Sequence, residues 1–237
     1  MSSEGRRPPR DQARRRGGAI KAAKGGRLPG WVREEVVRST PRTRRDAALR
    51  ALAEGIGAFS EERYARALRS LREAKRLAPR AATIRELLGL AAYQEERWEE
   101  ALRELRTFRR LTGDTTHMAV ELDCLRALGR DADVHKTWER FRELGGGRIA
   151  DDEARVVYAS FLLDHGDHRR AWQIIKPGRL VENAPESRLR RWFVAAKVAA
   201  ASGDRRAATT LAEAVRKQAP DMPGLDELQA EIERLPT

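Results

Sequence analysis

The sequence predicts an all-α solenoid, a fold in which helix-turn-helix units stack in chain order. Shifting the 237-residue chain against itself by 34 residues aligns Gly55 with Gly89 and Ala67 with Ala101 in one register. Self-similarity at this period is typical of helical repeats, because a single hairpin cannot bury its apolar face and needs a stacked neighbour. Only 5% of the residues are aromatic and 35% are charged, which favours repeated helices over an enzyme fold with a large pocket.

The first two repeats carry small residues at fixed places. Counted from Ala48, Gly55 occupies the eighth place of the first repeat, Ala67 the twentieth, Ala74 the twenty-seventh and Pro79 the thirty-second. In these places the chain resembles the tetratricopeptide repeat (TPR) family, which implies a right-handed α-solenoid. Small residues at the eighth and twentieth places allow the two helices of a hairpin to approach closely.

Three further repeats follow, with Gly129, Gly166 and Gly203 as the turn glycines inside their hairpins. The fifth repeat has the residues typical of the family at four places: Trp192, Ala196, Ala208 and Pro220. In the fourth repeat Pro177 cannot continue a helix, so we expect its second helix to be short. In the third repeat, Leu122 and Val134 replace the usual small residues. A glycine run at 145–147 then predicts a bend or flexible joint near residues 145–150.

This pattern divides the chain into four parts: a disordered basic arm at 1–30, an N-terminal helix and lead-in at 31–47, a TPR-like repeat array at 48–220, and a C-terminal capping helix at 221–237. We expect the helix near residues 31–38 to pack on the first repeat, and either this helix or a partner to cover Leu52, Ile56 and Phe59. Thr40 is predicted to be the N-cap of the helix that follows. The capping helix would shield the last apolar face of the array.

The net charge of +12 lies mostly in the N-terminal arm. Its basic residues are Arg6, Arg7, Arg10, Arg14, Arg15, Arg16, Lys21, Lys24 and Arg27. Such an arm would attract RNA or another polyanion in a salt-dependent way, and without an aromatic residue it would bind nonspecifically. The alternative is a solubilising tail without a binding role. The chain contains 41 Arg and only 7 Lys, a ratio that the codon bias of a GC-rich bacterial genome would produce without selection for arginine.

Residues that could carry chemistry have structural explanations. Asp167 in the run Asp164–His168 is a natural N-cap and His165 a favourable last-turn cation, so we expect no metal site there. A single cysteine, Cys124, excludes an internal disulfide and is expected to be buried and inert. Four tryptophans are expected to pack between helices: Trp98, Trp138, Trp172 and Trp192. No catalytic or cofactor-binding set is found, so enzyme activity is not expected.

The concave wall of a TPR array is lined by the first helix of each repeat, and the resemblance implies that a protein or peptide ligand binds there. The corresponding positions are Glu86, Leu90 and Tyr93 in the second repeat, Asp123 and Arg126 in the third, Glu153, Val156 and Ser160 in the fourth, and Arg190, Phe193 and Lys197 in the fifth. Two functions remain: a protein-binding scaffold or adaptor, or an RNA- or ribosome-associated factor anchored by the arm. The sequence contains no run of 18 apolar residues, so no membrane span is predicted. A cytoplasmic location is therefore expected.

Overall fold

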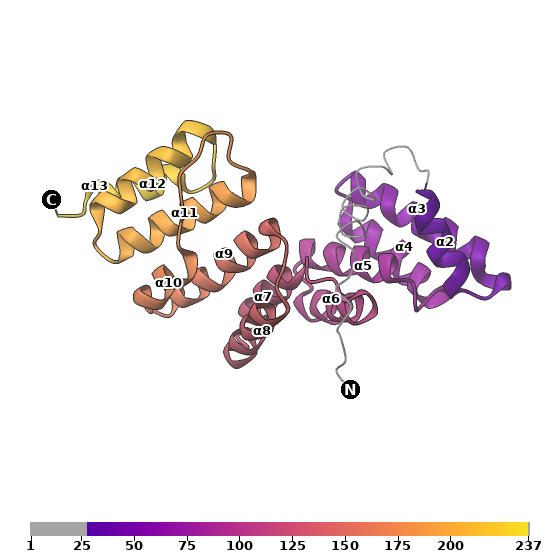
Figure 1. Cartoon of the computed structure of the whole chain (residues 1–237). Helices are drawn as coiled ribbons and strands as arrows, with labels where there is room; N and C mark the ends of the chain where they lie inside the picture. The colour runs from indigo at the N-terminus through magenta and orange to yellow at the C-terminus, as the bar shows by residue number, and fades with distance from the viewer. Residues whose placement is uncertain (1–27, 237) are drawn as a thin grey trace. The chain divides into compact units, whose positions relative to one another are not determined.

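The computed structural model describes residues 28–236, which contain twelve α-helices and no strand (Figure 1). The helices are α2 (Gly30–Ser39), α3 (Arg42–Ser60), α4 (Tyr64–Leu77), α5 (Ala82–Gln94), α6 (Trp98–Thr112), α7 (Met118–Ala127), α8 (Asp131–Leu144), α9 (Arg148–Asp164), α10 (His168–Ile175), α11 (Glu186–Ala201), α12 (Arg205–Gln218) and α13 (Leu225–Glu233). Helices α3 to α12 correspond in order to the five predicted hairpins. The basic arm lies outside the described residues, apart from positions 28–30.

Close approach of paired helices depends on the small residues that define the repeat. A Cβ atom added at Gly55 of α3 would lie 2.7 Å from the side chain of Leu71 on α4. The same distance separates a Cβ at Gly89 of α5 from Leu105 on α6. Ala67 and Ala101, on the facing helices, are completely buried. The pattern read from the sequence therefore marks the positions at which these two hairpins close.

A buried carboxylate joins the first two hairpins. Glu104 of α6 is completely buried and accepts hydrogen bonds from Lys75 Nζ of α4 at 2.9 Å and from Arg85 Nη1 of α5 at 2.6 Å. Burial acts to raise the pKa of Glu104, but the hydrogen bonds from the two cations outweigh it, so the pKa lies below its ordinary value. The ionised carboxylate thus links three successive helices.

The chain divides into two compact units, Met1–Arg130 and Asp131–Thr237. The boundary separates α7 from α8, the two helices of the third hairpin, in which Leu122 and Val134 replace the usual small residues. Residues 145–147 connect α8 to α9 inside the second unit, so the joint expected near residues 145–150 does not coincide with this boundary.

Helix α8 is fixed on α9 by aromatic side chains in the second unit. Trp138 stacks on Tyr158 with ring centroids 4.6 Å apart, and His135 Nδ1 lies 2.7 Å from Tyr158 Oη. The next helix, α10, has only eight residues and ends before Pro177, which confirms the short second helix of the fourth repeat. Trp172 on α10 is 37% exposed, so its expected core position is wrong. The buried face of this short helix is formed instead by Ala171 and Ile175, which are spaced by one turn.

Helix α2 packs at the start of the array through Val32 and Val36, which are completely buried. Its Glu35 reaches the first turn of α5, where the carboxylate accepts hydrogen bonds from the backbone N–H groups of Ala82 and Thr83 and from the Thr83 hydroxyl. Helix α5 has no side-chain N-cap of its own. Glu35 therefore satisfies backbone donors that the local sequence leaves open, and its negative charge meets the positive end of the helix dipole.

We predict that Glu35→Ala lowers the free energy of unfolding by about 1 kcal/mol, the usual effect of losing an N-cap. The neighbouring Glu34 is exposed on the same helix, so Glu34→Ala provides a control with the same change of charge. Urea unfolding followed by circular dichroism measures both variants. Equal losses of stability in the two variants would show that Glu35 does not act as a cap.

The connection from α2 to α3 differs from the prediction. Helix α3 begins at Arg42 with Pro41 as its N-cap residue, and Thr40 has extended backbone outside the helix. The Thr40 hydroxyl is buried without a hydrogen-bond partner, so the predicted N-cap role of Thr40 is wrong. The rigid φ angle of Pro41 is already suited to the residue that precedes a first helical turn, so the helix starts without a side-chain cap.

Helix α13 covers the end of the second unit. Leu225, Leu228 and Ile232 are buried on one face, and the backbone oxygen of Leu235 accepts a hydrogen bond from Arg205 of α12 at 2.7 Å. Leu52 and Ile56, on the first repeat helix, are likewise buried at the other end of the described chain. Within residues 28–236, no helix is long and apolar enough to cross a membrane.

Candidate functional site

In the first unit, the residues predicted to face the groove bind one another. The Tyr93 hydroxyl on α5 donates a hydrogen bond to Asp123 Oδ2 on α7 at 2.6 Å, and Arg126 Nη1 donates to Asp123 Oδ1 at 3.1 Å. Glu86 is buried and its Oε1 lies 2.8 Å from His117 Nε2. Burial raises the pKa of Tyr93 well above its ordinary value, and the hydrogen bond with Asp123 raises it further. These groups connect α5 to α7.

The carboxylates of Glu86 and Asp123 are therefore already engaged in hydrogen bonds within the protein. His117 faces Glu86, while Asp123 is shared by a hydroxyl and a guanidinium group. Leu90 is half-buried. A ligand that bound here through cationic groups would have to displace contacts that the protein already makes, which weakens the case for the first unit as a peptide site.

In the second unit, three of the predicted groove residues line one hollow of about 720 Å³. These are Val156 of α9 and Arg190 and Phe193 of α11. The remaining lining consists of Glu186 and Val194 of α11, Gln218 at the end of α12, and the rim residues that follow it: Ala219, Pro220, Asp221, Met222 and Pro223. The groove positions of the repeat identified three lining residues on α9 and α11, but not residues 221–223, which lie beyond the predicted array.

The hollow combines an apolar floor with basic groups at its edge. Phe193 and Val156 are half-buried, and Lys197 Nζ lies 6.0 Å from the centroid of the Phe193 ring. Arg190 is exposed and forms an ion pair with Glu186, one turn earlier on α11. Such an exposed pair contributes little to stability, so the guanidinium group can exchange this partner for a ligand at small cost. Glu153, Ser160 and Lys197, the other predicted groove residues of this unit, do not line the hollow.

The two walls of the hollow are held together by a buried ion pair that the sequence reasoning missed. Asp152 of α9 is completely buried, and Arg191 of α11 is 8% exposed. Arg191 Nη1 donates to Asp152 Oδ1 at 2.8 Å, and Arg188 Nε donates to Asp152 Oδ2 at 3.1 Å. In the sequence, Asp152 follows Asp151 near a helix start, where a negative charge is favourable without any distant partner. Its role requires a partner 39 residues away, for which the local sequence gives no signal.

The segment between α10 and α11 is held by side chains that reach its backbone. Arg191 donates to the carbonyl groups of Ile175 and Lys176, and Trp192 Nε1 donates to the carbonyl of Pro177 at 3.1 Å. Gln218, which also lines the hollow, binds the backbone of this segment at Val181 and Ala184. The irregular segment is thus attached both to the wall and to the rim of the hollow.

The other residues considered for chemistry have structural contacts. Asp167 accepts a hydrogen bond from the backbone N–H of Arg170 at 3.0 Å, which confirms it as an N-cap. His165 lies at the C-terminal end of α9, where the hydrogen bond to the Phe161 carbonyl, with a further contribution from Asp131, raises its pKa. Burial raises the pKa of the Cys124 thiol to about 12. In the part of the chain that the structure describes, no cluster of histidine, cysteine and acidic residues could hold a metal ion.

No protein-family model and no curated protein matches the chain. Among solved structures, the chain is similar to YrrB, which is described as "a TPR protein with an unusual peptide-binding site". The TM-score is 0.51 and the sequence identity 17%, over 77% of this chain and 92% of that one. At this identity the similarity establishes the fold alone. Together with the five consecutive hairpins, it shows that the described residues form a TPR-like helical repeat array.

Proposed function

We propose that the protein is a protein-interaction scaffold and that it binds a segment of a partner in the hollow between α9, α11 and the residues that precede α13. The observation that carries this proposal is the composition of the hollow. A half-buried aromatic and a valine form its floor, while Arg190 and Lys197 stand near it. Concave sites with an apolar floor and a few polar groups are typical ligand-binding surfaces.

The partner segment should combine an apolar side chain with a nearby acidic group. The apolar side chain would cover Phe193 and Val156, and the acidic group would meet Arg190 or Lys197. The hydrogen bonds that Glu86 and Asp123 already make within the protein leave the first unit a weaker candidate for this role. The peptide-binding site attributed to YrrB in its description supports the choice of a peptide as the class of ligand.

We predict that peptides selected on the full chain from a displayed library lose affinity at least about tenfold on Phe193→Ala, because a buried aromatic contact contributes roughly 1.5–3 kcal/mol. Arg190→Glu should weaken peptides that carry the acidic group. Trp172→Ala is the matched control, since Trp172 is an exposed aromatic of the same unit that lies outside the hollow. Fluorescence anisotropy with the selected peptides measures the three affinities.

Thermal unfolding of each variant shows whether a loss of affinity reflects a loss of structure. The proposal fails if the library yields no peptide. It also fails if the selected peptides bind Phe193→Ala as well as they bind the unchanged protein. Loss of binding on Tyr93→Phe instead would assign the ligand to the first unit.

A further inference from the structure

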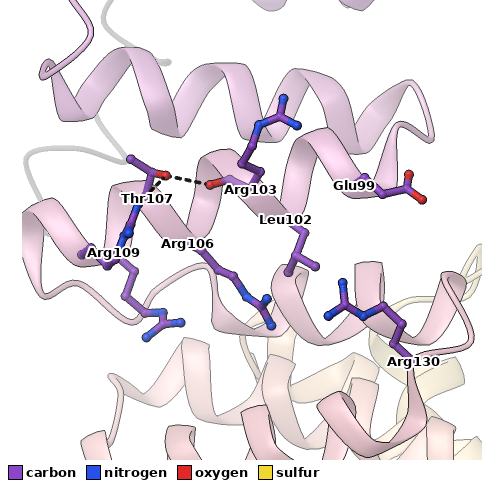
Figure 2. Close-up of a pocket in the computed structure, with 8 residues that line it drawn as sticks. Glu99, Leu102, Arg103, Arg106, Thr107, Arg109 and Arg130 are labelled. Atoms are coloured by element: carbon purple, nitrogen blue, oxygen red, sulfur yellow. Dashed lines mark hydrogen bonds between the residues drawn. The ribbon is translucent and has the colours of Figure 1, made fainter.

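A second hollow, of about 580 Å³, lies on the first unit and is lined mainly by arginines (Figure 2). Its lining residues are Glu99, Leu102, Arg103, Arg106, Thr107, Arg109 and Arg110 of α6, together with Arg130, which follows α7. In Figure 2 the side chains of Arg106 and Arg130 extend toward each other with Leu102 between them, whereas Arg103 extends away from them. Two guanidinium groups thus converge on the same space from different elements.

Among the described residues, Arg106 and Arg110 line this hollow without a hydrogen bond to a carboxylate. Glu121 of α7 is buried and is shared by two arginines: Arg109 holds it through two hydrogen bonds of 2.9 and 3.0 Å, and Arg106 Nε lies 3.7 Å from it. Within residues 28–236, Arg110 donates a hydrogen bond only to the Thr107 hydroxyl, at 3.2 Å. Arg106 and Arg110 therefore keep guanidinium N–H groups for an external anion, and the excess charge favours its binding.

The local chemistry favours a carboxylate-bearing ligand. Arg109 already holds Glu121 in the bidentate arrangement that matches a guanidinium group to a carboxylate. The lining contains no aromatic side chain on which a nucleic-acid base could stack, and the aliphatic stems of the arginines offer apolar surface beside the charges. The chain's own N-terminal arm has the same sign of charge and is not a suitable occupant.

We infer that this arginine hollow on α6 binds an acidic peptide segment of a partner protein, with at least two neighbouring Asp or Glu side chains. The inference does not depend on the function proposed for the second unit, since the two hollows share no residue. It assigns the array a second class of contact, in which charge rather than apolar burial selects the partner. Binding should weaken as salt rises, because the exposed charges become screened.

The test variant is Arg106→Gln combined with Arg110→Gln in the full chain. Both side chains can be removed without leaving a buried carboxylate alone, since Glu121 keeps the shorter bonds from Arg109. The matched control is Arg140→Gln combined with Arg142→Gln. These two arginines lie on α8 in the second unit, both are exposed, and their removal changes the net charge equally. Thermal unfolding of both double variants verifies that each remains folded.

The probe is a fluorescein-labelled hexaglutamate peptide, and its affinity is measured by fluorescence anisotropy at low ionic strength. We expect the Arg106/Arg110 variant to bind it roughly tenfold more weakly than the unchanged chain, and the Arg140/Arg142 control to change affinity less than about twofold. A hexaglutamate peptide with a photoreactive terminal group should crosslink to the segment that contains residues 99–110.

Three outcomes would overturn the inference. The first is equal affinity of hexaglutamate for the test and control variants. The second is crosslinking confined to residues 1–27, which would assign the peptide to the basic arm. The third is tighter binding of a uridine oligonucleotide of equal charge with the same loss on the Arg106/Arg110 variant, which would identify a nucleic-acid surface instead.

Discussion

Replacing Asp152 with alanine is expected to lower the free energy of unfolding by about 3 kcal/mol or more, the range measured when one partner of a buried ion pair is removed. Asp152 is completely buried and is the acceptor for Arg191 and Arg188. Without it, the buried Arg191 guanidinium group keeps its backbone carbonyl partners but only the longer contact with Asp151, at 3.8 Å, among its carboxylates in the described part of the chain. Urea unfolding followed by circular dichroism measures the effect.

The neighbouring Asp151 provides the control for this prediction. It has the same side chain, is partly exposed, and pairs with Arg155 one turn away at 2.7 Å. Asp151→Ala should therefore cost less than about 1 kcal/mol. If the two variants were equally stable, the buried pair would not be the connection between α9 and α11 that its geometry indicates. A double variant, Asp152→Ala with Arg191→Met, should recover part of the loss because it removes the uncompensated charge.

Two glycine-to-alanine substitutions in repeat helices should have opposite effects on stability. At Gly89 the new methyl group would lie 2.7 Å from Leu105, which is completely buried, so Gly89→Ala should destabilise by about 1–3 kcal/mol through overpacking. At Gly57 nothing lies within 4 Å of an added Cβ, so Gly57→Ala should stabilise α3 by about 0.5–1 kcal/mol.

The sign of this difference tests the packing of the repeat directly. Both substitutions give the same gain in helix propensity, so any loss at Gly89 must come from contact with α6. Differential scanning calorimetry of the two variants gives the order of their unfolding temperatures. A Gly89→Ala protein as stable as Gly57→Ala would mean that α5 and α6 do not approach as closely as described.

The fold could be predicted because its signal recurs along the chain. Gly55 and Gly89 each meet a leucine of the next helix, so the same packing requirement appears at a fixed spacing in the sequence. The short α10 followed from Pro177 alone, since proline cannot continue a helix. In both cases the physical constraint acts on neighbouring residues or on a repeated position.

The long-range contacts of the structure could not be predicted from the local sequence or from the repeat. Glu35 acts on a helix 47 residues further along the chain, and Asp152 acts on an arginine 39 residues away. The sequence shows that the segment of α6 is rich in arginine. It does not show that these arginines surround one hollow, because that arrangement depends on the position of α7 and of Arg130, which the repeat period does not determine.

The position of the rim has a consequence for how the second unit would respond to a partner. Residues 218–223 border the hollow on one side and lead directly into α13, and a Cβ at Gly224 would lie only 3.3 Å from the Phe193 ring. The start of α13 therefore packs closely against Phe193, which lines the hollow. Under the proposed function, binding of a partner segment in the hollow and packing of α13 would be thermodynamically linked, so that stabilising one would stabilise the other.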